Sequence, residues 1–520
     1  MGGSFFPAEN IDTATLDAGV QTESATWLTK FFQKFKPQGF KALETRLGHM
    51  IQTKISPTEP IDSNISRELM ISFAYPVYTC AFRRLDGKIR IEYDVRKHDN
   101  TGAFALTANE GAIFKPYLLA NMWRKATLVI GSTEFNWNYD YGLTHYIEKL
   151  LTLRKEHYDR EREMTGFVVQ RAYTTPNKAS LPQPAADRWV HPLFDIPAPI
   201  TVAPGPGNAA WNQTDWETLW DGGLAIPKAG KRKTLYGNLP HPLFNDDKMW
   251  PPECPMTLRL EPNKAAKIFY ANPNLVPTLR IQRIQIIDTV YPVSDEMMEK
   301  SATDVINKSL SWDFAFTTPQ TIWRNLSNAT VIDYPNVWNG PWPRLIVFSF
   351  HPTACRTETK PNTNKFMSKF PPLKRFTVYS GQNEYPQRGG IEFRNIPALA
   401  TPTKMDDYHT TAEIKQIIED NKDIFDDVQR VVAHPNDVGL LYWDAKQFFT
   451  SQFFLPVAFT PIPQNAEVRN VVFPKETGEM GVRLEFVHEI NGDEWSMCMT
   501  CFKDADLTLT PPAWTAVGTW

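Results

Sequence analysis

The sequence predicts an all-β protein with a few inserted helices, arranged as two tandem antiparallel β-sandwiches. The chain has 520 residues, which is more than one compact domain usually holds. Its 42 prolines disfavour long helices and suit short strands joined by long loops. Apolar residues alternate along many short segments, and strands and helices do not alternate in a regular βαβ rhythm.

Two turn dipeptides predict hairpins. Asp86-Gly87 lies between an apolar segment at 68–82 and the alternating segment Lys88–Val95. Asn491-Gly492 lies within Val482–Thr500, where alternating apolar residues precede and follow it. Asp-Gly and Asn-Gly both favour type I′ turns, so we expect each dipeptide to join two paired strands.

One long strand is predicted at Leu279–Tyr291. Its apolar phase shifts between Ile281 and Ile284, which indicates a β-bulge. Shorter apolar segments predict further strands at Ala126–Ile130, Met256–Leu260, Lys267–Tyr270, Leu345–Phe350, Arg375–Tyr379, Val438–Trp443 and Phe453–Phe459.

Helical periodicity interrupts the strands once in each half. Leu143–Tyr158 has apolar residues at i, i+4, i+7 and i+8. In the second half, Thr410–Glu413 is a capping box that opens a second helix. The inner side of that helix is expected to consist of Ile414, Ile417, Ile418, Phe425 and Val428. The pattern therefore predicts that each half consists of strands, one inserted helix and further strands.

These segments divide the chain into four parts. Residues 1–60 form an N-terminal arm, 61–293 the first sandwich, 294–311 a linker helix and 312–520 the second sandwich. The arm contains a short amphipathic helix that ends at Pro37. It packs on the protein or on a neighbouring subunit, or it lies on a membrane surface. Its apolar face consists of Trp27, Leu28, Phe31, Phe32 and Phe35.

Composition limits the class of partner and the compartment. The net charge is −3, from 55 basic and 58 acidic residues, so no specific nucleic-acid recognition is expected. Five cysteines are an odd number at low density, which favours a reducing interior over a disulfide scaffold. The chain shows no secretion signal and no apolar stretch of membrane-spanning length, so we expect a protein that is not secreted.

Catalytic motifs are absent from the sequence. It contains no phosphate loop, no Gly-x-Ser-x-Gly elbow, no His-Glu-x-x-His and no His-x-His. Cys498 and Cys501 form a lone Cys-x-x-Cys on a predicted strand, where their side chains point to opposite faces. Carboxylate pairs such as Asp426-Asp427 are typical of solvated surfaces. We therefore expect no enzyme, with no catalytic, cofactor-binding or metal-binding residues.

An ordered series of segments over about 65–510 resembles a known family. The first half contributes a strand, polar turn and helix at Leu128–Trp137 and Tyr141–Leu151. His241–Pro252, running into Met256–Leu260, resembles the segment that closes the family's first domain. Further matching segments are Asp86-Gly87 with its strand, Leu279–Val293, Trp342–Phe348, Asn362–Phe366, Phe376–Pro386 and Thr410–Val428. In this order they resemble the double jelly-roll major capsid proteins of small eukaryotic DNA viruses, especially the Polinton/Maverick and adintovirus-like group.

The resemblance implies two tandem antiparallel jelly-roll β-sandwiches and no catalytic residue. It also implies a homotrimeric capsomer with a pseudo-hexagonal outline, an icosahedral virion shell and contacts with penton or minor capsid proteins. The protein would then be made inside the host cell, and the apolar face of the arm would contact a membrane or the shell interior.

Two other readings stay open at this point. Trp211, Trp216 and Trp220 lie in a segment rich in proline, glycine and tryptophan, and such tryptophans stack on sugars in carbohydrate-binding β-sandwich proteins. A metal-dependent enzyme on a double sandwich is the third possibility.

Overall fold

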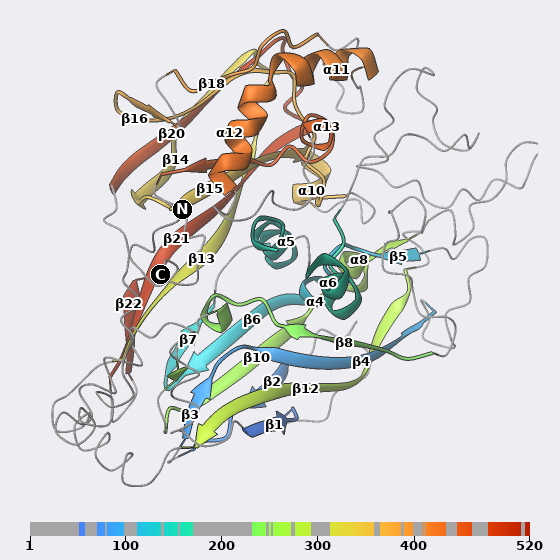
Figure 1. Ribbon diagram of the computed structural model, residues 1–520, viewed down its shortest axis with the longest axis vertical. Coiled ribbons are helices and arrows are strands. Elements are labelled where there is room, and N and C mark those ends of the chain that lie inside the picture. Colours follow the sequence, from blue (N-terminus) through green and yellow to red (C-terminus); the bar gives the residue numbers. More distant parts are fainter. Residues whose placement is uncertain are drawn as a thin grey trace, which may run out of the picture.

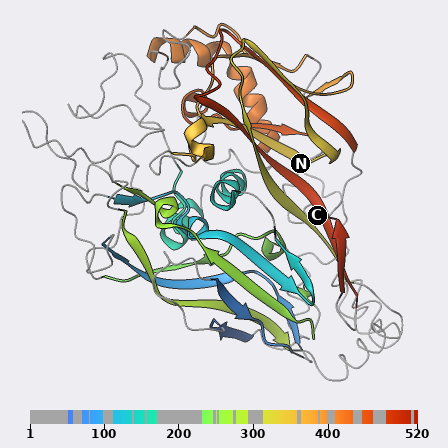
Figure 2. The same cartoon turned by 180° about the vertical axis from the view of Figure 1, so that it is seen from behind.

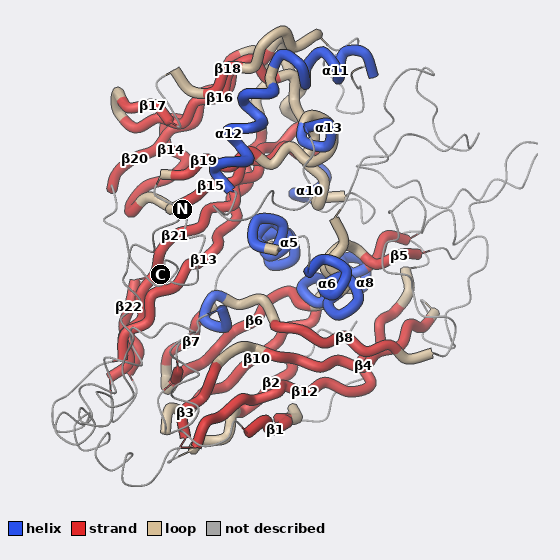
Figure 3. The backbone as a smooth tube through the Cα atoms, in the orientation of Figure 1, coloured by secondary structure: helices blue, strands red, loops and turns tan. Residues whose placement is uncertain are grey.

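The computed structural model describes the greater part of both halves of the chain. The described residues are 51–57, 70–78, 81–97, 112–136, 140–153, 157–169, 231–245, 249–250, 253–271, 276–292, 312–357, 364–385, 389–398, 409, 411–432, 445–459, 477–510 and 515–519. Figures 1 and 3 show two groups of strands, one above the other, with helices between them and at the upper end.

The first group consists of two sheets, and every strand pair in them is antiparallel. One sheet holds β1 (Ile51–Ile55), β3 (Ala81–Arg84), β4 (Lys88–Arg96), β8 (Lys233–Asn238), β9 (Met249–Trp250) and β12 (Thr278–Pro292). The other holds β2 (Ile71–Ala74), β6 (Trp123–Ile130), β7 (Thr133–Phe135) and β10 (Met256–Pro262). A separate small pair joins β5 (Ala112–Phe114) and β11 (Phe269–Ala271), and the helical segments are α4 (Leu118–Asn121), α5 (Tyr141–Thr152), α6 (Tyr158–Thr165), η3 (Pro242–Asn245) and α8 (Ala265–Ile268).

The second group is also a pair of antiparallel sheets. One sheet holds β13 (Trp312–Asn325), β15 (Leu345–Pro352), β19 (Leu455–Ala458), β21 (Trp495–Thr510) and β22 (Thr515–Thr519). The other holds β14 (Val331–Pro341), β16 (Leu373–Ser380), β17 (Asn383–Tyr385), β18 (Ile391–Glu392) and β20 (Thr477–Phe486). Its helices are α10 (Thr353–Thr357), α11 (Thr411–Asp420), α12 (Lys422–Val432) and α13 (Ala445–Phe448).

The strand order is the same in the two groups. In the first, the main strands pair in the orders β1-β12-β4-β8 and β2-β10-β6-β7. In the second, the orders are β13-β21-β15-β19 and β14-β20-β16-β17. The strands of each group can be counted in chain order without the short or additional strands β5, β9, β11, β18 and β22, and with β3 and β4 as one interrupted strand. In this count, both groups place their first, eighth, third and sixth strands in one sheet. Both place their second, seventh, fourth and fifth strands in the other. This is the jelly-roll order, so the chain is two tandem jelly rolls, as predicted.

The hairpin predicted at Asp86-Gly87 is wrong. β3 and β4 do not pair with each other, because both pair with β12 in the same direction. Arg84 pairs with Thr289 and Ile89 with Ile286, so the segment carries two more residues than the strand opposite. The dipeptide is therefore an interruption within one strand, and the positive φ of Gly87 fits a bulge as well as a turn.

The hairpin predicted at Asn491-Gly492 is also wrong. The alternating segments on either side of the dipeptide are β20 and β21, and these strands lie in different sheets of the second roll. An alternating pattern indicates that one face of a strand is buried. Strands in both sheets of a sandwich have this pattern, so it does not show which two strands pair. Gly492 is nevertheless needed, because a Cβ there would lie 2.0 Å from the backbone oxygen of Leu326.

Other expectations agree with the structure or are refined by it. The register of β12 against β4 shifts between Ile281 and Arg283, which confirms the predicted bulge. The helix predicted at Leu143–Tyr158 is two helices, α5 and α6. The helix that follows Thr410 is likewise split into α11 and α12 at the buried Asn421, whose side chain binds the backbone oxygens of Ile417 and Arg394.

The first sheet begins earlier than predicted. The sequence analysis places residues 51–55 in the N-terminal arm, whereas in the structure they form β1 and pair with β12. Three predicted elements lie outside the described residues. They are the amphipathic helix of the arm, the linker helix at 294–311 and the strand at Val438–Trp443.

Each roll buries its core between its two sheets. In the second roll, the rings of Phe348 on β15 and Phe376 on β16 lie 4.7 Å apart across the core, and both side chains are fully buried. In the first roll, Trp123, Trp250 and Tyr93 are among the largest fully buried side chains. Such aromatic residues contribute much of the apolar area removed from water on folding.

We expect Phe348→Ala to lower the free energy of unfolding by about 3–5 kcal/mol, because it leaves a cavity between the two sheets. Chemical denaturation of the purified protein measures the change. Val331→Ala is the matched control, since Val331 is 49% exposed and its truncation should change stability by less than about 0.5 kcal/mol. Equal effects of the two substitutions would contradict this description of the core.

Candidate functional site at the junction of the two rolls

Helix α5 lies between the two jelly rolls. It is inserted between β7 and β8 of the first roll, and Figures 1 and 2 both show it in the space between the two groups of strands. The helix is buried along most of its length, which is unusual for a helix that follows a polar turn. Its buried residues are Tyr141, Gly142, Leu143, Thr144, His145, Tyr146, Ile147 and Leu150.

Local interactions fix where α5 begins. The side chain of Asp140 caps the helix by accepting a hydrogen bond from the backbone nitrogen of Leu143 at 3.5 Å. Gly142 lets the first turn approach α4 closely, because a Cβ at this position would lie 2.1 Å from Oδ1 of Asn121. Asn121 in turn donates hydrogen bonds to the backbone oxygens of Pro116 and Tyr117.

The helix contacts the outer face of the sheet formed by β13, β21 and β15. Phe348 points inward to Phe376, so its neighbours Val347 and Ser349 point outward on the same strand. Residues 345–351 of β15 are buried on both faces. Such double burial means that the outer face of this sheet is covered by other parts of the protein.

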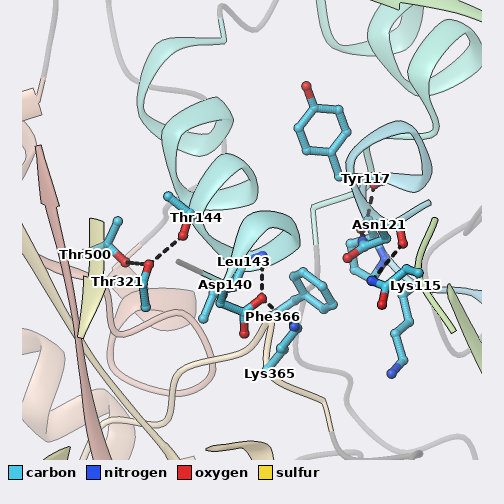
Figure 4. Close-up of polar contacts among 12 residues, drawn as sticks. Lys115, Tyr117, Asn121, Asp140, Leu143, Thr144, Thr321, Lys365, Phe366 and Thr500 are labelled. Atoms are coloured by element: carbon cyan, nitrogen blue, oxygen red, sulfur yellow. Dashed lines mark hydrogen bonds and ion pairs between the residues drawn. The ribbon is translucent and has the colours of Figure 1, made fainter. Parts of the chain in front are cut away.

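A row of threonine hydroxyl groups crosses the contact (Figure 4). Oγ1 of Thr144 on α5 lies 2.5 Å from Oγ1 of Thr321 on β13, which lies 3.4 Å from Oγ1 of Thr500 on β21. A hydroxyl group can donate as well as accept, so each of these three side chains has a hydrogen-bond partner within the contact.

An ion pair joins the rolls at the start of α5. Nζ of Lys365, from the second roll, lies 2.6 Å from Oδ1 of Asp140, and both side chains are largely buried. Burial alone would raise the pKa of the Asp140 carboxyl, but the Lys365 ammonium and the Leu143 N–H outweigh it and hold the pKa below its ordinary value. The Asp140 carboxyl is therefore ionised at neutral pH, and its contact with Lys365 links the helix cap of one roll to a loop of the other.

Aromatic contacts extend the junction. The rings of Tyr146 on α5 and Phe366 lie 5.1 Å apart, edge to face. The hydroxyl of Tyr270 donates to Oδ1 of Asn364 at 2.8 Å, and this hydrogen bond is buried. Burial raises the pKa of Tyr270 well above its ordinary value, so the phenol remains a neutral donor.

Lys115 lies beside this contact. Its Nζ donates to the backbone oxygen of Ala266 at 2.9 Å and lies 5.1 Å from the centre of the Tyr270 ring. Burial, together with the charges of Lys365 and Lys267, lowers the pKa of Lys115 well below its ordinary value. Burial first, and then the charges of Lys365 and Lys264, lower the pKa of Lys267 to about 8, although the nearby Asp140 acts in the opposite direction.

Two buried histidines lie near the junction. His241 precedes η3, which packs on β13, and its Nδ1 accepts from the backbone nitrogen of Leu243 at 3.3 Å. His351 ends β15, where Nε2 lies 2.7 Å from Oγ of Ser349. Burial, and for His241 also the nearby His145, lowers the pKa of each histidine to about 3. Both rings are therefore neutral in the folded protein at neutral pH.

The described residues hold no group of three His, Cys, Asp or Glu side chains placed to bind a metal ion. Cys498 and Cys501 are fully buried free cysteines on β21, and burial raises the pKa of both thiols, well above the ordinary value for Cys498. Such thiols are poor nucleophiles.

Across the part of the chain that the structure covers, no helix has the length and apolarity to cross a bilayer.

Several residues singled out in the sequence lie outside the described part of the chain. They are the apolar face of the arm (Trp27, Leu28, Phe31, Phe32 and Phe35) and the tryptophans of the possible sugar site (Trp211, Trp216 and Trp220).

Sequence reasoning missed the junction itself. A usable signal was present in α5, where Tyr141, Thr144, His145 and Tyr146 occupy both faces of a helix otherwise expected to have one solvated side.

Known proteins resemble this chain in structure but not in sequence. No family model matches the chain, and no curated protein matches it by sequence. A chain in the cryo-EM structure of the Sputnik virophage aligns with a TM-score of 0.50 and 9% identity, covering 91% of this chain and 88% of that one. The mavirus major capsid protein aligns with a TM-score of 0.43 and 11% identity, covering 90% of each chain. The Faustovirus major capsid protein aligns with a TM-score of 0.40 and 7% identity, covering 94% of this chain and 99% of that one.

The Sputnik alignment extends over both rolls, so the tandem arrangement as well as the single roll is a known fold. At this low identity the similarity concerns the fold alone.

We expect Asp140→Asn to lower the free energy of unfolding by about 1–3 kcal/mol, because it removes a charged partner from the largely buried Lys365 ammonium while keeping a capping side chain. Denaturant titrations at pH 7 measure this change. Arg394, which pairs with Asp423 at an exposed position, provides the control: Arg394→Gln should cost less than about 1 kcal/mol. A loss for Asp140→Asn no larger than that of the control would contradict the role of the ion pair.

Acid should destabilise the protein through His241 and His351. Each histidine is neutral in the folded protein, whereas in the unfolded chain it takes up a proton below its ordinary pKa of about 6.5. The two histidines therefore do not reduce the free energy of unfolding above pH 6.5, and they reduce it increasingly as the pH falls towards about 3. The expected loss is about 3 kcal/mol per histidine at pH 4.

Unfolding free energies between pH 7.5 and 4 test this for the wild type and for His351→Gln. The variant should show a shallower fall than the wild type, whereas His157→Gln, at an exposed position, should follow the wild type. Parallel curves for His351→Gln and the wild type would show that His351 does not carry the acid sensitivity.

Proposed function

We propose that this chain is a major capsid protein whose copies form pseudo-hexagonal homotrimeric capsomers and assemble an icosahedral virion shell. The observation that carries the proposal is the pair of jelly rolls with one strand order, joined through a buried junction. Three copies of such a unit supply six similar sandwiches. Six similar units around one axis tile a hexagonal lattice, which forms the facets of an icosahedral shell when fivefold units occupy its vertices.

The junction supports this use because it makes the two rolls one body. A helix buried between them, a row of hydroxyl groups and an ion pair would all have to be broken for one roll to move relative to the other. A shell subunit needs this rigidity, since its two sandwiches must present fixed outer surfaces to several neighbours at once.

Two further observations support the proposal. The chain that aligns over both rolls belongs to the structure of a virophage. The ordered segments of the sequence resemble the capsid proteins of the Polinton/Maverick and adintovirus-like group, and we place this chain near that group. The buried lysines, tyrosines and histidines of the junction have structural partners and form no catalytic arrangement, which suits a protein that is not an enzyme.

The proposal includes partners and location. The chief partner is a further copy of this chain, and penton or minor capsid proteins complete the shell. The protein is made inside the host cell and resides in the virion capsid. Trp27, Leu28, Phe31, Phe32 and Phe35 of the arm contact a membrane or the inside of the shell.

Electron microscopy and sedimentation of the purified full-length protein test this function. We expect trimers with a six-lobed outline at micromolar concentration and closed particles under assembly conditions. Strong binding of a monomer to a glycan array, without assembly, would instead support a carbohydrate-binding protein. A chain that stays monomeric at every concentration would contradict the proposal.

A further inference from the structure

The helical insertion of the first roll has a counterpart in the second. α5 and α6 lie between the fifth and sixth strands of the first roll, β7 and β8, and α11 and α12 lie between β17 and β19, the fifth and sixth strands of the second. The second helix of each insertion contacts the sixth strand of its own roll, α6 on β8 and α12 on β19. The two insertions are therefore equivalent in position as well as in chain order.

Among the described residues, the first insertion packs on a sheet of the other roll. Its helix α5 packs on the outer face of β13-β21-β15 in the second roll. Figures 1 and 2 show α11 and α12 at the end of the molecule remote from the first roll. The outward side of this helix pair is polar and exposed, and it carries Lys415, Gln416, Glu419, Lys422, Asp423 and Asp427.

The sheet of the first roll that corresponds to β13-β21-β15-β19 is β1-β12-β4-β8. Its outer face differs from that of the second roll, since long charged side chains alternate along it and are partly or fully exposed. The pairing register places Arg283 opposite Glu92 and Lys54 opposite Ile287 on this face. We call it the basic sheet face, and its basic members are Lys54, Lys88, Arg90, Arg96, Arg280 and Arg283.

Ion pairs within the basic sheet face leave it positively charged. Arg90 pairs with Glu92 at 2.9 Å and Arg96 with Asp94 at 3.1 Å. Three cations, Lys54, Arg280 and Arg283, form no ion pair with any residue that the structure describes. An excess of positive charge on a flat polar surface favours a partner with acidic side chains.

The helix pair α11–α12 carries the complementary charge. Within 411–432 the acidic residues Glu413, Glu419, Asp420, Asp423, Asp426 and Asp427 outnumber the basic residues Lys415, Lys422 and Arg430. Asp423 is paired with Arg394 at 2.7 Å, and the remaining acids still exceed the bases. We call this element the acidic helix pair.

We propose that the acidic helix pair of one copy docks on the basic sheet face of a second copy, repeating between chains the contact that α5 makes within one. The inference rests on the proposed capsid function and names the surfaces through which the copies meet. Such a contact is head-to-tail, because each copy offers its helix pair at one end and its sheet face at the other. Head-to-tail contacts build closed rings when the rotation per copy closes.

Charge reversal tests the contact in the full-length protein. Arg280→Glu with Arg283→Glu gives a sheet variant, and Glu419→Lys with Asp427→Lys gives a helix variant. Each places like charges across the proposed interface, so each should raise the dissociation constant of the oligomer at least about tenfold. Analytical ultracentrifugation over a concentration series measures the constant.

The combined variant, with all four substitutions, is the decisive sample. It restores opposite charges with the signs exchanged, so its dissociation constant should return to within about threefold of the wild type. Lys374→Glu is the control, because Lys374 is an exposed lysine on the other sheet of the second roll and should leave assembly unchanged. Equal thermal unfolding midpoints for all variants show that the folds are intact.

The outcomes separate this inference from the proposed function. If the wild type forms trimers and the sheet variant forms them equally well, or if the combined variant fails to recover, the proposed interface is wrong while the capsid function stands. If the wild type itself never assembles, the capsid function is wrong, and this interface is wrong with it.

Discussion

The contact between α5 and the sheet of β13, β21 and β15 determines how the two rolls relate to each other. A jelly roll needs only the inner faces of its sheets to form a core, and its outer faces are free to meet water. Here one outer face of the second roll is also covered, by a helix that belongs to the first roll. The two sandwiches therefore share a buried surface, and neither can be removed without exposing it.

This surface combines aromatic packing with polar contacts, and the polar contacts distinguish it from the cores on either side. Hydroxyl groups, an ion pair and a tyrosine–asparagine hydrogen bond meet there, and each requires a particular geometry. Apolar packing alone tolerates small rotations of one body on another, whereas buried polar groups lose free energy when their partners move. The junction thus holds one relative orientation of the rolls. It also brings Lys115, His241 and His351 into positions where their charged forms are disfavoured.

The sequence predicted the architecture well and the strand pairing less well. Alternation located the strands and even the bulge between Ile281 and Ile284, because burial of one face is a local property of a strand. Alternation does not say which strand is the neighbour. The segments around Asn491-Gly492 alternate correctly and yet belong to different sheets, and Asp86-Gly87 interrupts a strand where a turn was expected.

The partners across the junction could not be predicted for the same reason. Asp140 and Lys365 are 225 positions apart, and nothing near either residue indicates its partner. A chain that no family model and no curated protein matches by sequence still carries a known fold, because its strands follow a known order. That order depends on which faces are buried, and many different sequences bury the same faces.

Hydrogen exchange of the backbone amides of α5 tests the central claim most directly. If the helix is a buried component shared by the two rolls, the amides of residues 144–152 should exchange as slowly as those of the core strand β21, through global unfolding. The amides of α11, a helix with an exposed side, should exchange faster. Exchange of α5 at the rate of α11 would mean that the rolls separate readily in solution, and the account of a single rigid subunit would then be wrong.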